Sequence, residues 1–176
     1  MKARKNSVHR GSTKGDQMNI TELKRFCSTD DSRISIQAPW THDGYTWATN
    51  GHILVRVPEM VDVPENTFAP DCSKLLAKQP QAVTWFLVPK CSMPAPLLCQ
   101  WCSGTSKDKR NRRRKCNECK GSRTVENDIA NLMVSGTCFA KRYLALIQGW
   151  KIAPNGKGPA WIRHSDALGL LMPIYL

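Results

Sequence analysis

Apolar and polar residues alternate early in the chain in a way that predicts a short helix followed by antiparallel strands. Asn19 and Glu22 have the spacing of a helix capping box, and apolar residues then fall on one face of a helix that ends near Ser28. From Arg33 to Trp40 every second residue is apolar, which predicts a strand with one buried face.

Two further strands follow closely enough to form a meander. Residues 42–44 (His-Asp-Gly) have turn chemistry, and apolar residues alternate again over 45–49 and 53–57. The pair Asn50-Gly51 between these two segments is a strong signal for a tight hairpin. The first half of the chain is therefore expected to be a helix followed by three strands.

The second half repeats this order of elements after a connection without regular structure. The stretches 58–70 and 89–98 each contain three prolines, which favours extended or turn conformations. The pattern predicts an α+β fold made of two helix-plus-meander halves. The helices of the later part are expected at 71–78 and 139–148, and its strands at 83–88, 123–126, 131–138, 160–163 and 168–176.

Four cysteines form two pairs whose spacing is typical of a structural zinc site. Cys99 and Cys102 are separated by thirteen residues from Cys116 and Cys119, and each pair is followed two residues later by a glycine. Glycine accepts the positive backbone angles that a metal-binding knuckle needs. Because four thiolates complete the tetrahedral sphere of Zn²⁺, the site is expected to be structural and not catalytic. Two disulfides or four buried free thiols are the alternatives.

The segment between the cysteine pairs is strongly cationic, and only Asp108 opposes its charge. We expect zinc to fold this segment, which is too short to form its own core. A metal-supported cationic loop favours the phosphates of nucleic acid, DNA more than RNA, although a solvated charge run is the alternative. The candidate nucleic-acid contacts are Lys107, Lys109, Arg110, Arg112, Arg113, Arg114 and Lys115.

Charge is concentrated in two parts of this chain, whose formal net charge is +12. Residues 1–17 and 107–120 contain 13 of the 26 lysines and arginines, whereas the remainder is nearly balanced. The first 17 residues lack apolar periodicity and are expected to be a disordered basic tail, with the ordered protein starting near Met18. Neither a signal peptide nor a membrane span is evident, so a cytoplasmic protein without a membrane partner is expected. We find no residue constellation typical of an enzyme.

Three stretches resemble segments of the bacterial DNA polymerase III β sliding clamp. Residues 48–54 (Ala-Thr-Asn-Gly-His-Ile-Leu) are similar to the clamp segment Ala-Thr-Asp-Gly-His-Arg-Leu. Residues 171–176 (Leu-Met-Pro-Ile-Tyr-Leu) resemble its closing strand, and 139–146 resemble the helix before its final meander. The resemblance implies one clamp-type domain, with the sheet outside and two helices facing DNA, where a clamp subunit has three such domains.

In that family the first and last of these stretches line a groove that receives short peptides from polymerases. The resemblance therefore implies a peptide groove in this chain, while a plain hairpin and a core strand are the alternatives. The matching positions are Thr49, Gly51, His52, Leu54, Met172, Pro173 and Leu176.

These observations predict a basic tail at 1–17, a single sliding-clamp-like α+β domain at 18–98 and 122–176, and an inserted four-cysteine zinc-ribbon or knuckle module at 99–121. The first functional hypothesis is a non-enzymatic DNA-binding accessory protein of phage or mobile-element replication, which can form a homo-oligomer. The second is an interaction module that mimics a clamp domain to engage or inhibit host replication or defence proteins. A weaker third hypothesis is a chaperone-like zinc protein. The Cys-x-x-Cys-x-Gly units resemble those of DnaJ-type chaperones, which indicates a shared knuckle geometry and not a shared activity.

Overall fold

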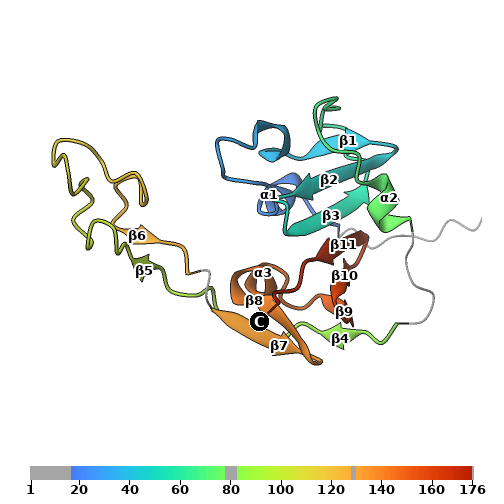
Figure 1. Ribbon diagram of the computed structural model, residues 1–176. Helices are drawn as coiled ribbons and strands as arrows, with labels where there is room; N and C mark the ends of the chain where they lie inside the picture. The colour runs from blue at the N-terminus through green and yellow to red at the C-terminus, as the bar shows by residue number, and fades with distance from the viewer. Residues whose placement is uncertain (1–16, 78–82, 128–129, 176) are drawn as a thin grey trace, which may run out of the picture.

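The computed structural model of the chain describes residues 17–77, 83–127 and 130–175. Residues 1–16 of the expected tail and Leu176 of the expected groove lie outside this range. The described part is a mixed fold in which antiparallel strands predominate and helices are few and short. A small module projects from one side of this body (Figure 1).

The body is built on a seven-stranded antiparallel sheet in which two meanders lie side by side. The first meander is β1–β2–β3, the second is β9–β10–β11, and they join where β11 pairs with β3. The sheet order is β1 (Trp40–His42), β2 (Tyr45–Thr49), β3 (Ile53–Pro58), β11 (Ala167–Leu171), β10 (Gly158–His164), β9 (Lys151–Asn155) and β4 (Phe86–Leu87).

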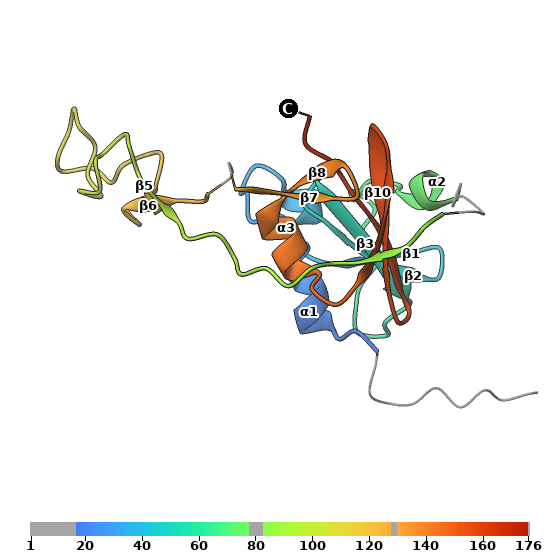
Figure 2. The same ribbon diagram turned by 90° about the horizontal axis from the view of Figure 1, so that it is seen from below.

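Each meander is preceded by a helix, and both helices lie on the same side of the sheet. α1 (Ile20–Lys24) comes before β1 and α3 (Lys141–Leu146) comes before β9, and Figure 2 shows them on the side opposite α2 (Ser73–Leu76). The predicted capping box is confirmed at α1, where Asn19 and Glu22 bond each other's backbone N–H groups at 3.0 Å. A helix thus comes before each meander, while the prediction that the chain consists of two repeated halves stays a prediction.

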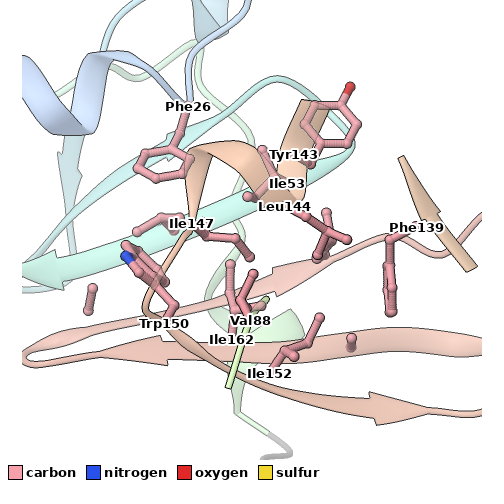
Figure 3. Close-up of a cluster of buried hydrophobic side chains, with 14 of the residues drawn as sticks. Phe26, Ile53, Val88, Phe139, Tyr143, Leu144, Ile147, Trp150, Ile152 and Ile162 are labelled. Carbon is pink, nitrogen blue, oxygen red and sulfur yellow. The ribbon is translucent and has the colours of Figure 1, made fainter. Parts of the chain in front are cut away.

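The two faces of the sheet bury separate cores. Figure 3 shows Phe26 from the α1 region with Leu144 and Ile147 from the α3 region, over Ile162 and its neighbours. Leu23 of α1 belongs to the same cluster. The opposite face buries a second, tryptophan-rich cluster beneath α2. This cluster includes Trp40, Trp47, Leu54, Cys72, Leu76 and Trp161.

Two short ribbons complete the described structure. β5 (Leu97–Leu98) pairs with β6 (Thr124–Val125) at the base of the projecting module. β7 (Asn131–Val134) pairs with β8 (Thr137–Ala140) beside α3. The chain thus leaves the body at β5 and returns through β6, so the cysteine-containing segment is anchored at both ends by one ribbon.

The strand predicted for 33–40 is wrong, because only its last residue lies in a strand. Asp30 Oδ1 accepts hydrogen bonds from the Ser32 backbone N–H and hydroxyl at 2.9 and 2.8 Å, which folds the chain into a turn. One turn of 3-10 helix, η1 (Ile34–Ile36), follows. Ile34 is 76% exposed, so the alternation of apolar residues here does not mark a buried face.

Several other predicted elements differ from the structure in their bounds, and the strand expected at 83–88 has only the two residues of β4. The single strand expected at 131–138 is a hairpin, since Ser135 and Gly136 have φ angles of 47° and 80°. The helix expected at 139–148 begins later, at Lys141, and the closing strand expected at 168–176 ends at Leu171. β9 was not predicted at all.

Candidate metal centre

The two cysteine pairs meet at a single point in the module. The four sulfur atoms lie within 4.8 Å of one another, and all four side chains are buried. The Sγ–Sγ distance is 3.9 Å from Cys99 to Cys116 and 3.7 Å from Cys102 to Cys119. Four ligands placed 2.3 Å from one ion at tetrahedral corners are about 3.8 Å apart. The four-cysteine cluster therefore has the dimensions of a metal site, and these distances exceed a disulfide bond of about 2 Å.

Backbone geometry after each cysteine pair explains why glycine follows. Ser103 and Gly104 have φ angles of 52° and 75°, and Lys120 and Gly121 have 46° and 92°. Each pair of left-handed residues turns the chain sharply behind the second cysteine. Glycine adopts such angles without steric cost, so the expectation of positive backbone angles at both glycines is confirmed.

Two hydroxyl residues brace the cluster in the same way, and the sequence analysis missed them. Thr105 donates its backbone N–H and hydroxyl to the Cys102 carbonyl oxygen at 3.0 and 2.7 Å. Ser122 donates the equivalent pair to the Cys119 carbonyl oxygen at 2.8 and 2.6 Å. The available signal was that each hydroxyl residue directly follows its glycine, which makes the repeat Cys-x-x-Cys-x-Gly-Thr/Ser.

Hydrogen bonds among the thiols prepare the cluster for a cation. Burial raises the pKa of the Cys102 thiol, but hydrogen bonds from the Cys99 thiol and the Ser106 backbone outweigh burial and lower this pKa to about 6. A backbone hydrogen bond from Cys102 lowers the pKa of Cys99, but burial and thiol hydrogen bonds together raise it to about 11. Cys102 is thus the thiol that loses its proton more readily than Cys99, and a bound cation would favour loss of the protons from all four thiols.

The cluster has almost no apolar core around it. Among the buried and half-buried apolar side chains that the structure describes, Val125 alone packs against the four cysteines. Leu98 covers Gly104, where an added Cβ would lie 2.9 Å from the leucine Cδ1 atom. Because so little apolar surface is buried, the four sulfurs are the main internal contact of the module.

The loop between the cysteine pairs is a compact hairpin with its cations outside. Asp108 Oδ1 accepts the backbone N–H groups of Arg110 and Asn111 at 2.7 and 3.0 Å, and the Asp108 N–H donates to the Arg114 carbonyl oxygen at 3.0 Å. The backbone N–H of Arg110, followed by that of Asn111, lowers the pKa of Asp108, so this carboxylate is ionised while it shapes the turn. All seven candidate cations from Lys107 to Lys115 are exposed.

The seven cationic side chains of the loop are available to bind an external anion. Within the described residues none of them pairs with a carboxylate, and Lys109 Nζ makes a 3.4 Å contact with the Gln100 carbonyl oxygen. The ion pair of the module is instead Lys120 with Asp31 of the body, at 3.7 Å. The loop therefore presents a large excess of positive charge at the tip of a projecting arm (Figure 1).

The two segments expected to form a peptide groove lie next to each other. The Met172 backbone N–H donates to the His52 carbonyl oxygen at 2.9 Å, so these strand ends are joined. His52 and Met172 are exposed, whereas Leu54 is only 6% exposed and belongs to the tryptophan-rich core. Pro173 is also buried. The structure thus brings the two segments together, but it buries Leu54 and Pro173, which were expected to line the groove.

The other two groove candidates among the described residues, Thr49 and Gly51, stabilise the hairpin turn. Thr49 donates its hydroxyl to the Ile53 carbonyl oxygen at 2.7 Å and accepts the Gly51 backbone N–H at 3.0 Å. Gly51 has a φ of 91°, as a tight turn requires. Both residues therefore have a structural role at the β2–β3 connection.

A cleft of ≈ 660 Å³ opens beside this turn and was not predicted from the sequence. His52 stacks on Tyr143 with ring centroids 5.7 Å apart, and the Arg142 guanidinium lies 4.7 Å from the centroid of the same ring. Met93 and Leu146 contribute apolar walls, so the cleft lies between the body and the connections to the module.

Comparisons with known proteins give this chain no relative. No family model, curated protein or solved structure matches it. Over the described ranges, none of the helices has the length and apolar character needed to cross a bilayer. The class defined by fold and site is thus a strand-rich α+β protein with a buried four-cysteine cluster able to hold a metal ion.

Proposed function

We propose that this chain is a zinc-containing, non-enzymatic nucleic-acid-binding protein, in which one Zn²⁺ ion on the four-cysteine cluster supports a cationic loop. The observation that supports the proposal is the cluster itself, with sulfurs within 4.8 Å at the base of seven exposed cations. Four thiolates suit a tetrahedral soft or borderline ion, and zinc is the common case.

The positive charge of the loop favours nucleic acid as its ligand. The loop's lysines and arginines make no ion pair with a carboxylate in the described part of the chain, so their counterions come from solution. Phosphates of nucleic acid release such counterions, which makes the affinity strongly dependent on salt. Contacts of this kind are independent of sequence, in keeping with an accessory protein of DNA replication whose clamp-like body carries the loop.

The test is a salt-titrated DNA-binding assay with matched charge variants. Replacing Arg110, Arg112, Arg113 and Arg114 by alanine should weaken binding to duplex DNA and reduce the salt slope by about 3 to 4, since each phosphate contact contributes about 0.9. Equal affinities for this loop variant and a control variant would remove the loop from the mechanism. The control replaces four exposed lysines elsewhere, Lys24, Lys74, Lys90 and Lys157, by alanine.

A protein-interaction role is the second candidate, and the cleft supports it. The two clamp-like segments are joined by the Met172–His52 hydrogen bond beside a cleft of ≈ 660 Å³ with apolar walls. If the body binds replication or defence proteins at this cleft, the immobilised wild-type chain should retain such a protein from a bacterial lysate that has been treated with nuclease. A variant with His52→Ala and Leu146→Ala should lose that partner, and the four-lysine control should keep it.

A further inference from the structure

A second cationic surface lies on the sheet, on the face opposite α1 and α3. The strand registers place one residue from each of the seven strands in a single row across this face. The row contains no carboxylate. From β1 to β4 its members are Trp40, Trp47, Arg56, Leu168, Arg163, Lys151 and Leu87.

Exposure changes along this row. The tryptophans on β1 and β2 are 2% and 1% exposed, because the segment around η1 and α2 covers that end of the sheet. Arg56 and Leu168 are half-buried, whereas Arg163 and Lys151 are exposed. The open end of the row is thus where its cations are, and we call Arg56, Arg163 and Lys151 the cationic row.

The cationic row is not neutralised by neighbouring groups. In the part of the chain that the structure describes, none of its members makes an ion pair or a side-chain hydrogen bond. Two other arginines of the body are paired, since Arg33 lies 4.0 Å from Asp30 and Arg142 lies 2.7 Å from Glu126. Cations gathered on one sheet face without carboxylate partners favour an anionic ligand from outside the chain.

Aromatic rings hold the two guanidinium groups in place. Arg56 lies 4.3 Å from the centroid of the Tyr45 ring, and Arg163 lies 4.1 Å from the centroid of the Trp85 ring. Arg163 stacks on one ring, so its N–H edge remains free for phosphate and its second face for a base. Arg56 also lies 5.7 Å from the centroid of the Trp47 ring, so it offers mainly its N–H edge. This ordering also reduces the entropy lost when a ligand binds.

A hollow beside Lys151 and Arg163, where β9 begins and β10 ends, can hold a phosphate group. It has a volume of ≈ 290 Å³ and is lined by Lys151, Arg163, His164, Ser165 and Gly149. His164 is fixed there by stacking on Trp150, with centroids 5.5 Å apart. Two cations and a hydroxyl therefore line one small concave site.

We propose that the cationic row binds single-stranded nucleic acid, with the phosphate backbone running across β3, β11, β10 and β9. Strands about 4.8 Å apart spread these cations over about 14 Å, a distance that several nucleotides span. Single strands are favoured over duplexes because the stacked guanidinium and aromatic planes offer surfaces that only unpaired bases can use. Figure 2 shows the projecting module on the other side of the sheet, so this surface is separate from the metal-supported loop.

The test compares two charge variants of the full chain with a fluorescent oligonucleotide of about 20 nucleotides, single-stranded or annealed. A variant with Arg56→Gln, Lys151→Gln and Arg163→Gln should bind the single strand at least about tenfold more weakly. Its salt slope should fall by about 2, because each neutralised phosphate contributes about 0.7 for single strands. The control replaces Lys24, Lys90 and Lys157 by glutamine, which removes the same charge from other exposed positions.

Equal single-strand affinity and salt slope for the two variants would overturn the proposal. If the Arg56 change lowers the melting temperature, the double variant Lys151→Gln and Arg163→Gln gives the same test, since both side chains are exposed. A loss confined to the loop variant would support the metal-supported loop and overturn the row. A loss of single-strand affinity confined to the row variant would support the cationic row and exclude the loop from single-strand binding.

Discussion

Gly169 in β11 shows how one residue lets the two meanders join. It pairs with Val55 of β3, and a Cβ atom added at Gly169 would overlap the Leu54 carbonyl oxygen and lie 3.1 Å from Ile162 Cγ1. Its backbone angles do not need glycine, so close approach is the reason for this residue. A side chain here would push β3 and β11 apart.

The substitution Gly169→Ala should therefore destabilise the body by about 3 kcal/mol through overpacking. Gly156→Ala is the comparison, because Gly156 has open space around it and only a φ of 55° to oppose alanine. It should cost about 1 kcal/mol. Urea unfolding measures both, and a Gly169 variant no less stable than the Gly156 variant would contradict this account.

Individual residues could be predicted where their chemistry is local. The spacing of Asn19 and Glu22 predicts a helix cap, and the pair Asn50-Gly51 predicts a turn. The structure contains both. Thr105 and Ser122 were missed because hydroxyl residues occur in any polar loop. Their role depends on two carbonyl oxygens that the fold brings within reach.

At the scale of elements, α1 depends on its cap more than on its length. It has five residues, too few to be stable alone, and it is held by the capping box and by Leu23, which is fully buried. Asn19→Ala should lower the free energy of unfolding by about 1 kcal/mol.

Glu22→Gln is the matched control, because glutamine also accepts the reciprocal hydrogen bond in a capping box. It should leave the stability within a few tenths of a kcal/mol of the wild-type value. Chemical denaturation followed by circular dichroism measures both variants. An alanine variant as stable as the glutamine variant would show that the cap does not hold α1.

The module should depend on its metal ion while the body does not. Four buried sulfurs and Val125 make up its core, whereas the body buries two extensive apolar clusters of its own. Removal of metal with a strong chelator should abolish hydrogen-exchange protection over residues 99–123 and leave the sheet strands protected. Persistent protection of Cys99 and Cys116 amides without metal would contradict this expectation.

Elements were predicted best where apolar alternation coincides with a turn signal. β2 and β3 follow this rule. β9 was missed because Pro154 and Asn155 are depleted in strands, and its pairing with β10 is interrupted by a register shift between Gly158 and Trp161. The false strand at 33–40 has the right alternation, but Asp30 turns the chain and Ile34 faces solvent.

At the scale of the whole molecule, the sequence indicated two helix-and-strand halves but not how they join. The pairing of β3 with β11 connects residues more than a hundred positions apart, and no local pattern encodes such a contact. The same holds for the cationic row, whose three members belong to three different strands. The four-cysteine cluster is the exception, because the requirement of one ion fixes the spacing of its ligands.

Metal content measured on the purified chain tests the central claim most directly. Elemental analysis should find about one zinc ion per chain, and a Cys102→Ser, Cys119→Ser double variant should contain none. The single change Cys138→Ser, at a buried cysteine outside the cluster, is the control and should retain the metal. Wild-type protein without stoichiometric metal, or a double variant that keeps it, would contradict the account.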